Sequence, residues 1–192
     1  MVFRINTPNS YSTSISSIAI DTNVLLWTFY GNLIRSVRYQ RTHYPNFLSN
    51  AITANRTALY TTYSNIFEAL HVIENNEYEI YLASQNLTKN DVSYKDYRTI
   101  ASERIKLKGT LSVFYNAVKA AINIEDFTEN KEILIKEFLD LYLLHQYDFY
   151  DFNLIKFSNK NNIKAILTDD IDFKSYQGLI NGINIYTANA KM

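Results

Sequence analysis

Short apolar stretches alternate along this chain with longer segments in which apolar residues recur every three to four positions. The short stretches are centred on Ile18, Leu59, Ile124, Ile166 and Ile185. Each is too brief for a helix and therefore predicts a strand. Strands that alternate with helices are typical of α/β proteins. We expect a single domain over residues 1–192, with a central, mostly parallel sheet of five strands flanked by helices in three layers.

The helical segments differ in length. Apolar spacing predicts helices over residues 23–30, 63–75, 77–87, 94–121 and 128–140, one beginning at Pro45 and one following Asp151. Residues 76–121 are rich in lysine and arginine. We expect them to form an extra helical hairpin with a basic face, inserted in the domain or extending it.

Carboxylates stand where the predicted strands end. Asp21 follows the first strand, and Asp170 follows the strand near Ile166. The tips of parallel strands meet at one edge of a sheet, where ligands bind in open α/β folds. Glu68 lies in a predicted helix and Asp151 opens one, so both can reach that edge. The alternative for Asp21 is a plain helix N-cap, and the alternative for Glu68 is an exposed side chain.

The third acid has two candidates. Asp148 and Asp151 are three residues apart, so both can lie on one face of a helix. Asp151 is the preferred candidate, because Asp148 stands where a helix cap is expected.

The composition narrows the chemistry of such a site. The chain has no Cys and three scattered His, which excludes thiolate ligands and argues against zinc. Converging carboxylates repel one another unless a cation neutralises them. Mg²⁺ takes oxygen ligands and keeps several waters, and such a site can activate water for phosphodiester cleavage.

Charge is unevenly distributed although the net charge is zero. No acid occurs between Thr22 and Phe67, and this stretch holds three arginines close together, interleaved with tyrosines: Arg35, Arg38, Arg41, Tyr39 and Tyr44. Guanidinium groups bind phosphate and aromatic rings stack on unpaired bases. We expect this segment to lie at the rim of the acidic site and to bind single-stranded RNA.

The N-terminal segment through Ser17 is polar and lacks the apolar stretch of a signal peptide. No apolar run approaches the length of a membrane span. We therefore expect a cytoplasmic protein that does not associate with membranes.

Taken in this order, the sequence resembles the PIN domain family, the nuclease fold of ribonuclease toxins in type II toxin–antitoxin systems and of RNA-processing factors. Four stretches carry the resemblance: residues 20–25 around Asp21, residues 64–70 around Glu68, the helix opened by Asp151, and residues 166–173 with the closing strand at 183–189. They span about half of the chain. Residues 76–121 are longer than in compact members of the family.

The resemblance implies a site and an activity. Asp21, Glu68, Asp151 and Asp170 would be catalytic acids that hold Mg²⁺ or Mn²⁺, with Asp148 and Asp172 as further candidates. Asn23 and Thr168 resemble polar residues that lie beside the metal ligands and contact them or the substrate. The implied activity is metal-dependent endoribonuclease cleavage of RNA, as the toxin of a toxin–antitoxin pair. The implied partners are RNA, an antitoxin protein and a second copy in a homodimer.

Two alternatives remain open. A PIN-like domain can bind RNA or protein without cleaving, although an intact set of four acids favours a nuclease. Phosphatases of the haloacid dehalogenase type also begin with Asp at a strand tip. They need a second Asp two residues later, where this chain has Asn23.

Overall fold

A six-stranded sheet in which every strand runs parallel to its neighbours forms the centre of the protein. The computed structural model describes residues 1–5, 15–55, 57–125, 131–142, 148–174, 176 and 182–192. The strands follow the order β1-β6-β5-β2-β3-β4. Their bounds are Val2–Arg4 (β1), Ser17–Ile20 (β2), Ala58–Thr62 (β3), Asn123–Glu125 (β4), Ala165–Leu167 (β5) and Asn184–Thr187 (β6). The α/β class and the parallel sheet expected from the sequence are confirmed.

The sheet has one strand more than expected. β1 pairs with β6 at the edge of the sheet, with Val2 opposite Ile185 and Arg4 opposite Thr187. All three residues of β1 are exposed. β1 was not predicted from the sequence: it is a three-residue strand that pairs on one side only.

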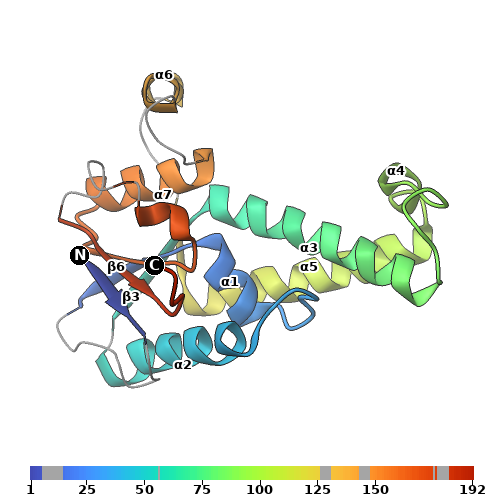
Figure 1. The fold of residues 1–192 in the computed structure, drawn as a ribbon, viewed down its shortest axis with the longest axis horizontal. Helices are drawn as coiled ribbons and strands as arrows, with labels where there is room; N and C mark the ends of the chain where they lie inside the picture. Colours follow the sequence, from blue (N-terminus) through green and yellow to red (C-terminus); the bar gives the residue numbers. More distant parts are fainter. Residues whose placement is uncertain (6–14, 56, 126–130, 143–147, 175, 177–181) are drawn as a thin grey trace.

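Helices cover both faces of the sheet. Their bounds are Thr22–Phe29 (α1), Arg38–Asn55 (α2), Tyr63–Ser84 (α3), Tyr94–Tyr97 (α4), Ala101–Ala121 (α5), Lys131–Tyr142 (α6) and Phe149–Lys160 (α7), and a 3₁₀ turn spans Ile171–Lys174. Figure 1 shows α7 along one face and α2 along the other. None of the helices in the described residues is long and apolar enough to cross a membrane.

Side chains that alternate along the strands pack into two hydrophobic cores, one on each face of the sheet. Ile18 and Ile20 pack with α1, α2, α3 and α5, while Ala19 between them packs with α7 on the opposite face. Ile166 likewise faces α7, and its neighbour Leu167 faces the other core. Successive strand residues point to opposite faces, so the two cores give the three layers expected for this class.

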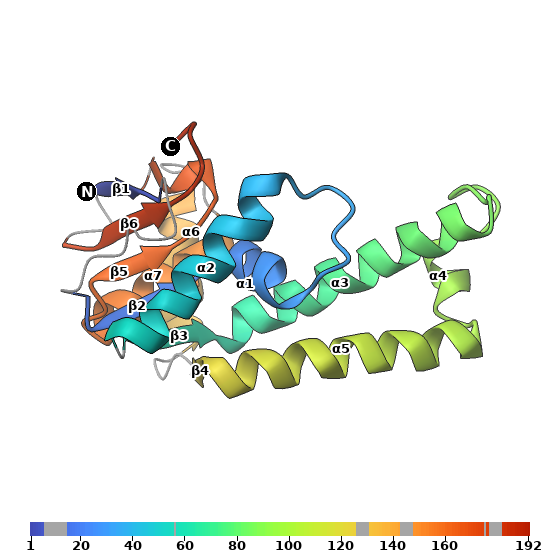
Figure 2. The same cartoon turned by 90° about the horizontal axis from the view of Figure 1, so that it is seen from below.

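α3 and α5 form a long hairpin that extends beyond the sheet, with α4 at its tip (Figure 2). The two helices predicted over 63–75 and 77–87 are one continuous helix, α3. The helix predicted over 94–121 is broken at Ile100, whose backbone is extended. Arg98 holds this tip to α3 through two hydrogen bonds to the Glu74 carboxylate, at 2.9 and 2.8 Å.

α2 begins at Arg38, seven residues before the expected start, and includes Pro45. A proline inside a helix removes the bond from its nitrogen to the carbonyl four residues earlier. Tyr44 and Phe47, on either side of it, are fully buried. Burial of these two rings outweighs the local cost of the proline, which is why the helix runs through it.

Replacing Pro45 with Ala is expected to raise the free energy of unfolding by about 1–3 kcal/mol, since Ala restores the missing bond and favours helix. Urea denaturation followed by circular dichroism measures it. Thr53→Ala, an exposed position in the same helix, is the control and should change stability by less than about 0.5 kcal/mol. A loss of stability in Pro45→Ala would mean that the proline shapes the packing of Tyr44 and Phe47.

Candidate active site

The order in which the strands are added to the sheet reverses between β2 and β5. From β2 the chain continues to β3 and β4 on one side, and from β5 it continues to β6 on the other. The two strands are neighbours, with Ile20 opposite Leu167. In open α/β sheets the ligand crevice lies at such a reversal, outside the carboxyl ends of the strands.

Asp21 follows β2 directly and is 3% exposed. Its backbone is extended, and its Oδ1 accepts a hydrogen bond from the Thr22 backbone N–H at 2.6 Å, so it caps α1. Its Oδ2 accepts a bond from the Thr168 hydroxyl at 2.8 Å. The capping role considered for Asp21 is therefore present, and it fixes the carboxylate at the strand tip.

Thr168 connects the two strand tips. Its hydroxyl donates to Asp21 and accepts from the backbone N–H of Asp170 at 2.9 Å. Asp170 is half-buried and accepts from the backbone N–H of Asp172 at 2.9 Å. Asp172 is exposed. The structure thus brings Asp170 toward Asp21 through Thr168.

Asp169, between Thr168 and Asp170, has a different role. Its carboxylate accepts from the Tyr44 hydroxyl, from Gln40 Nε2 at 2.9 Å and from the Tyr39 hydroxyl at 3.3 Å. These bonds attach α2 to the end of β5. The expectation that Tyr44 stacks on bases is wrong, because its ring is fully buried.

Glu68 reaches the site from α3. It is half-buried, and its Oε2 accepts a hydrogen bond from the Thr22 hydroxyl. Asn65 Nδ2 donates to the same hydroxyl at 2.9 Å. Thr22 therefore fixes the carboxylate of Glu68 beside the start of α1, and Glu68 does not extend into solvent.

The two candidates for the third acid differ in their surroundings. Asp148 is exposed and caps α7, accepting from the backbone N–H groups of Tyr150 at 2.8 Å and Asp151 at 2.9 Å. Asp151 is 7% exposed, and its Oδ2 accepts from the Tyr176 hydroxyl at 3.0 Å. Asp148 occupies the cap position expected for it, while Asp151 lies inside.

Asp21, Glu68, Asp148, Asp151 and Asp170, here called the acid cluster, share one electrostatic field. Burial, reinforced by the charges of Glu68 and Asp170, raises the pKa of Asp21 to about 7. Burial together with Asp148 and Asp170 raises the pKa of Glu68 to about 7.

The same field acts on the other two buried members. Burial, with the charges of Asp21, Asp148 and Asp170, raises the pKa of Asp151 to about 9. Burial also raises the pKa of Asp170, with Asp172 and Asp148 adding to it. Each of these four carboxyls is therefore harder to ionise in the folded protein than in water.

No Lys or Arg compensates this charge: in the described ranges, none of the five acids forms an ion pair. Among the described residues, no group of three or more His, Asp or Glu side chains is arranged to hold a metal ion. The donors are all carboxylate oxygens, which suit a hard cation that keeps part of its water and binds few protein ligands. By donor type alone, these oxygens suit Mg²⁺ or Mn²⁺, and Asp21, Glu68, Asp151 and Asp170 would be the groups to hold such a cation.

The polar and basic residues expected around the acids are only partly brought together. Asn23 lies half-buried in the first turn of α1, and its side chain bonds none of the acids. Arg35 is 85% exposed and lies 3.7 Å from the Glu79 carboxylate. Arg41 Nη2 donates to the Leu33 carbonyl at 2.9 Å. Arg38 is exposed and has no side-chain partner in the described part of the chain.

Several supporting residues were not anticipated from the sequence: Thr22, Asn65, Asn153 and Tyr176. Asn153 Nδ2 donates to the Ser64 hydroxyl at 2.8 Å and so joins α7 to α3. Asn65 and Asn153 are buried polar residues within apolar helical faces, which is a signal the sequence contains. Tyr176 lies outside the helices and strands, and no local pattern indicates its partner.

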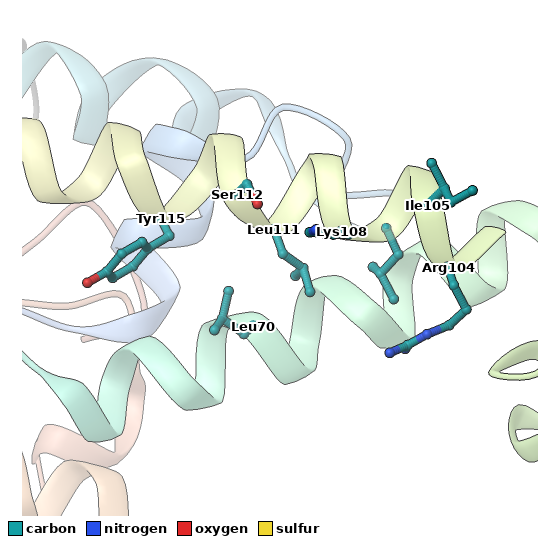
Figure 3. Close-up of a pocket in the computed structure, with 8 residues that line it drawn as sticks. Leu70, Arg104, Ile105, Lys108, Leu111, Ser112 and Tyr115 are labelled. Atoms are coloured by element: carbon teal, nitrogen blue, oxygen red, sulfur yellow. The ribbon is translucent and has the colours of Figure 1, made fainter. Parts of the chain in front are cut away.

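A cavity of about 550 Å³ lies between α3 and α5 (Figure 3). Leu70, Leu107, Leu111 and Tyr115 line it, with Arg104 and Lys108 among its polar neighbours. No carboxylate lines this cavity. The chemistry of the acid cluster therefore does not extend into it.

No model of a known protein family matches the sequence, and no characterised protein is significantly similar to it.

Proposed function

We propose that this protein is a metal-dependent endoribonuclease of the PIN type, which cleaves RNA phosphodiester bonds. One observation supports this most: four half-buried or buried acids meet at the reversal point of the sheet without any compensating cation from the described chain. Proteins seldom keep such a set of charges unless it holds a metal or moves protons. The order of these acids along the chain is also the order in PIN domains.

Each residue has a role in this proposal. Mg²⁺ or Mn²⁺, when bound, supplies a polarised water and neutralises charge on the scissile phosphate. Asp21 and Asp170, at the strand tips, would hold the cation together with Glu68 from α3 and Asp151 from α7. Thr168, Thr22 and Tyr176 orient three of these carboxylates through the hydrogen bonds described above.

The biological role that we propose is that of a toxin in a toxin–antitoxin pair, neutralised by an antitoxin protein. It rests on the resemblance of the sequence alone. The direct check is growth arrest when the chain is expressed, and its relief when Asp21 is replaced.

The proposed activity is tested by incubating the purified protein with labelled RNAs, both structured and single-stranded, in Mg²⁺ or Mn²⁺. We expect cleavage that EDTA stops and added Mn²⁺ restores. A protein that is inert at high concentration toward varied RNAs, but still binds them, would instead be the non-cleaving binding module.

Replacing Arg35, Arg38 and Arg41 together with Ala is expected to weaken RNA binding and to flatten its dependence on salt. Each lost phosphate contact lowers the slope of log K against log [salt] by about 0.7 for single strands. Fluorescence anisotropy of a labelled oligonucleotide at several salt concentrations measures both quantities. Arg38→Ala alone should give most of the change in slope, since Arg35 and Arg41 already have protein partners. An unchanged slope in the triple variant would exclude these arginines from RNA binding.

A further inference from the structure

A second cavity, of about 280 Å³, opens between α1, α3 and the loop that joins α1 to α2. α1 contributes Asn23 and Trp27, α3 contributes Val72 and Asn75, and the loop contributes Leu33 and Arg35. Figure 2 shows this loop running beside α3. The volume lies just below the range of about 300–1,000 Å³ that is typical of drug-sized ligands, so it suits one small planar group.

The cavity adjoins the acid cluster. Asn23 is two residues beyond Asp21, and Val72 is one helical turn, about 6 Å, beyond Glu68. The hydrogen bond from Thr22 to Glu68 holds the start of α1 against this part of α3. A nucleotide whose phosphate lies at the acids can therefore place its own base, or a neighbouring one, in the cavity.

Hydrogen bonds fix the walls before any ligand arrives. Asn76 Nδ2 donates to the Tyr30 hydroxyl at 2.7 Å and to the Asn32 carbonyl at 3.0 Å, and its Oδ1 accepts from the Ile34 N–H at 3.2 Å. The ring of Trp27 stacks on Tyr44 with centroids 5.5 Å apart and planes 20° apart. A binding surface that is already ordered loses little entropy when a ligand binds.

The lining leaves polar groups without partners beside apolar ones. In the part of the chain that the structure describes, the Asn23 amide and the Trp27 indole N–H make no hydrogen bond. Asn75 Nδ2 lies 3.1 Å from His71 Nε2, and its Oδ1 remains free. Leu33 and Val72 supply apolar contact. Arg35 and Glu79 also line the cavity, and their charged groups, 3.7 Å apart, offset each other. A nucleobase matches this set, because its faces are apolar and its edge carries both donors and acceptors.

We infer that this cavity binds one unpaired nucleobase of the RNA next to the cleaved phosphate. The inference rests on the proposed function and adds a base-binding subsite to it, which an RNA can fill only where it is single-stranded or looped. A base in a duplex is stacked and paired, so it cannot enter without being extruded at a cost of a few kcal/mol.

Trp27 makes the test direct, because it is the sole tryptophan of the chain. We would titrate the metal-free protein in EDTA with an unpaired oligoribonucleotide, the same sequence in a duplex, and an abasic ribose-phosphate oligomer. The unpaired strand should change the Trp27 emission at saturation, while the duplex and the abasic oligomer should change it little. A strand that bound only through its phosphates would give the same emission with bases and without them.

Asn75→Ala and Asn23→Ala should each weaken the titration by roughly 3- to 10-fold, as expected for one lost hydrogen bond. Asn90→Ala, a matched amide in the exposed turn before α4, is the control and should titrate as wild type. Thermal melts establish that each variant is folded. If Asn75→Ala does not fold, Asn75→Asp takes its place, because Asp keeps the size of the side chain.

The two proposals fail separately. If RNA is cleaved but Trp27 emission ignores the unpaired strand, the base pocket is wrong and the nuclease assignment stands. If the unpaired strand alone changes the emission but no RNA is cleaved, the pocket stands and the nuclease assignment falls. Equal responses to the unpaired and abasic strands would also overturn the pocket.

Discussion

Replacing Asp21 with Asn should reduce metal-dependent RNA cleavage by at least about 10²-fold, the scale seen when one electrostatic stabiliser of a transition state is removed. Asn keeps the shape of Asp and a carbonyl oxygen that can still accept from the Thr22 N–H. It removes the charge that sits between the two strand tips. The fold should therefore remain, while a bound cation would lose one of its proposed ligands. Single-turnover cleavage of a labelled RNA in Mn²⁺ measures the effect, and Asp170→Asn should behave in the same way.

The matched control is the pair on α7. Asp151→Asn should be as inactive as Asp21→Asn, because its carboxylate is buried within the acid cluster. Asp148→Ser should keep most of the activity, since Ser preserves the helix cap and the replaced carboxylate is exposed. The reverse result would make Asp148 the third ligand. Equal cleavage by wild type and Asp21→Asn would show that the activity does not come from this site.

The sequence predicted those parts of the fold whose buried residues form a regular apolar pattern along the chain. The inner strands β2, β3, β5 and β6 are largely buried, and Asp21 and Asp170 were found from their positions at strand tips. β1, a three-residue edge strand, was not predicted. The part of α2 before Pro45 was missed because the burial of Tyr44 depends on partners far along the chain. The role of Asp169 is hidden for the same reason, as its partner Tyr44 is 125 residues away.

In the candidate site too, some features follow from the sequence pattern and others depend on contacts between distant segments. Strand tips in a parallel sheet must meet at one edge, so the proximity of Asp21 and Asp170 follows from topology. The bond from Thr22 to Glu68 and the bond from Tyr176 to Asp151 depend on how α1, α3 and α7 pack. No spacing rule within one segment encodes such contacts. The sequence therefore indicates which acids meet but not what orients them.

The metal-free protein should lose stability as the pH rises from 5 to 9. Unfolding returns the buried carboxyls to pKa values near 4, whereas folding raises them to about 7 for Asp21 and Glu68 and about 9 for Asp151. Between those values the folded state binds more protons than the unfolded state, so stability is greatest below the unfolded pKa and falls as each group ionises. We expect a loss on the order of a few kcal/mol across this range, measured by urea denaturation in EDTA.

Mg²⁺ or Mn²⁺ should reverse much of this loss at pH 8 and little of it at pH 5.5, because a cation competes with protons for the same oxygens. At 100 times its dissociation constant a cation that binds only the folded state adds about 2.7 kcal/mol, or roughly 5–10 °C in the melting temperature of a chain this long. Asp151→Asn removes the most strongly perturbed carboxyl and should flatten the pH dependence in EDTA, whereas Asp140→Asn, an exposed acid on α6, should not. A metal-induced rise that is equal at both pH values, or that persists in Asp21→Asn, would mean that the cation binds elsewhere on the protein and that the acid cluster is stabilised by protons alone.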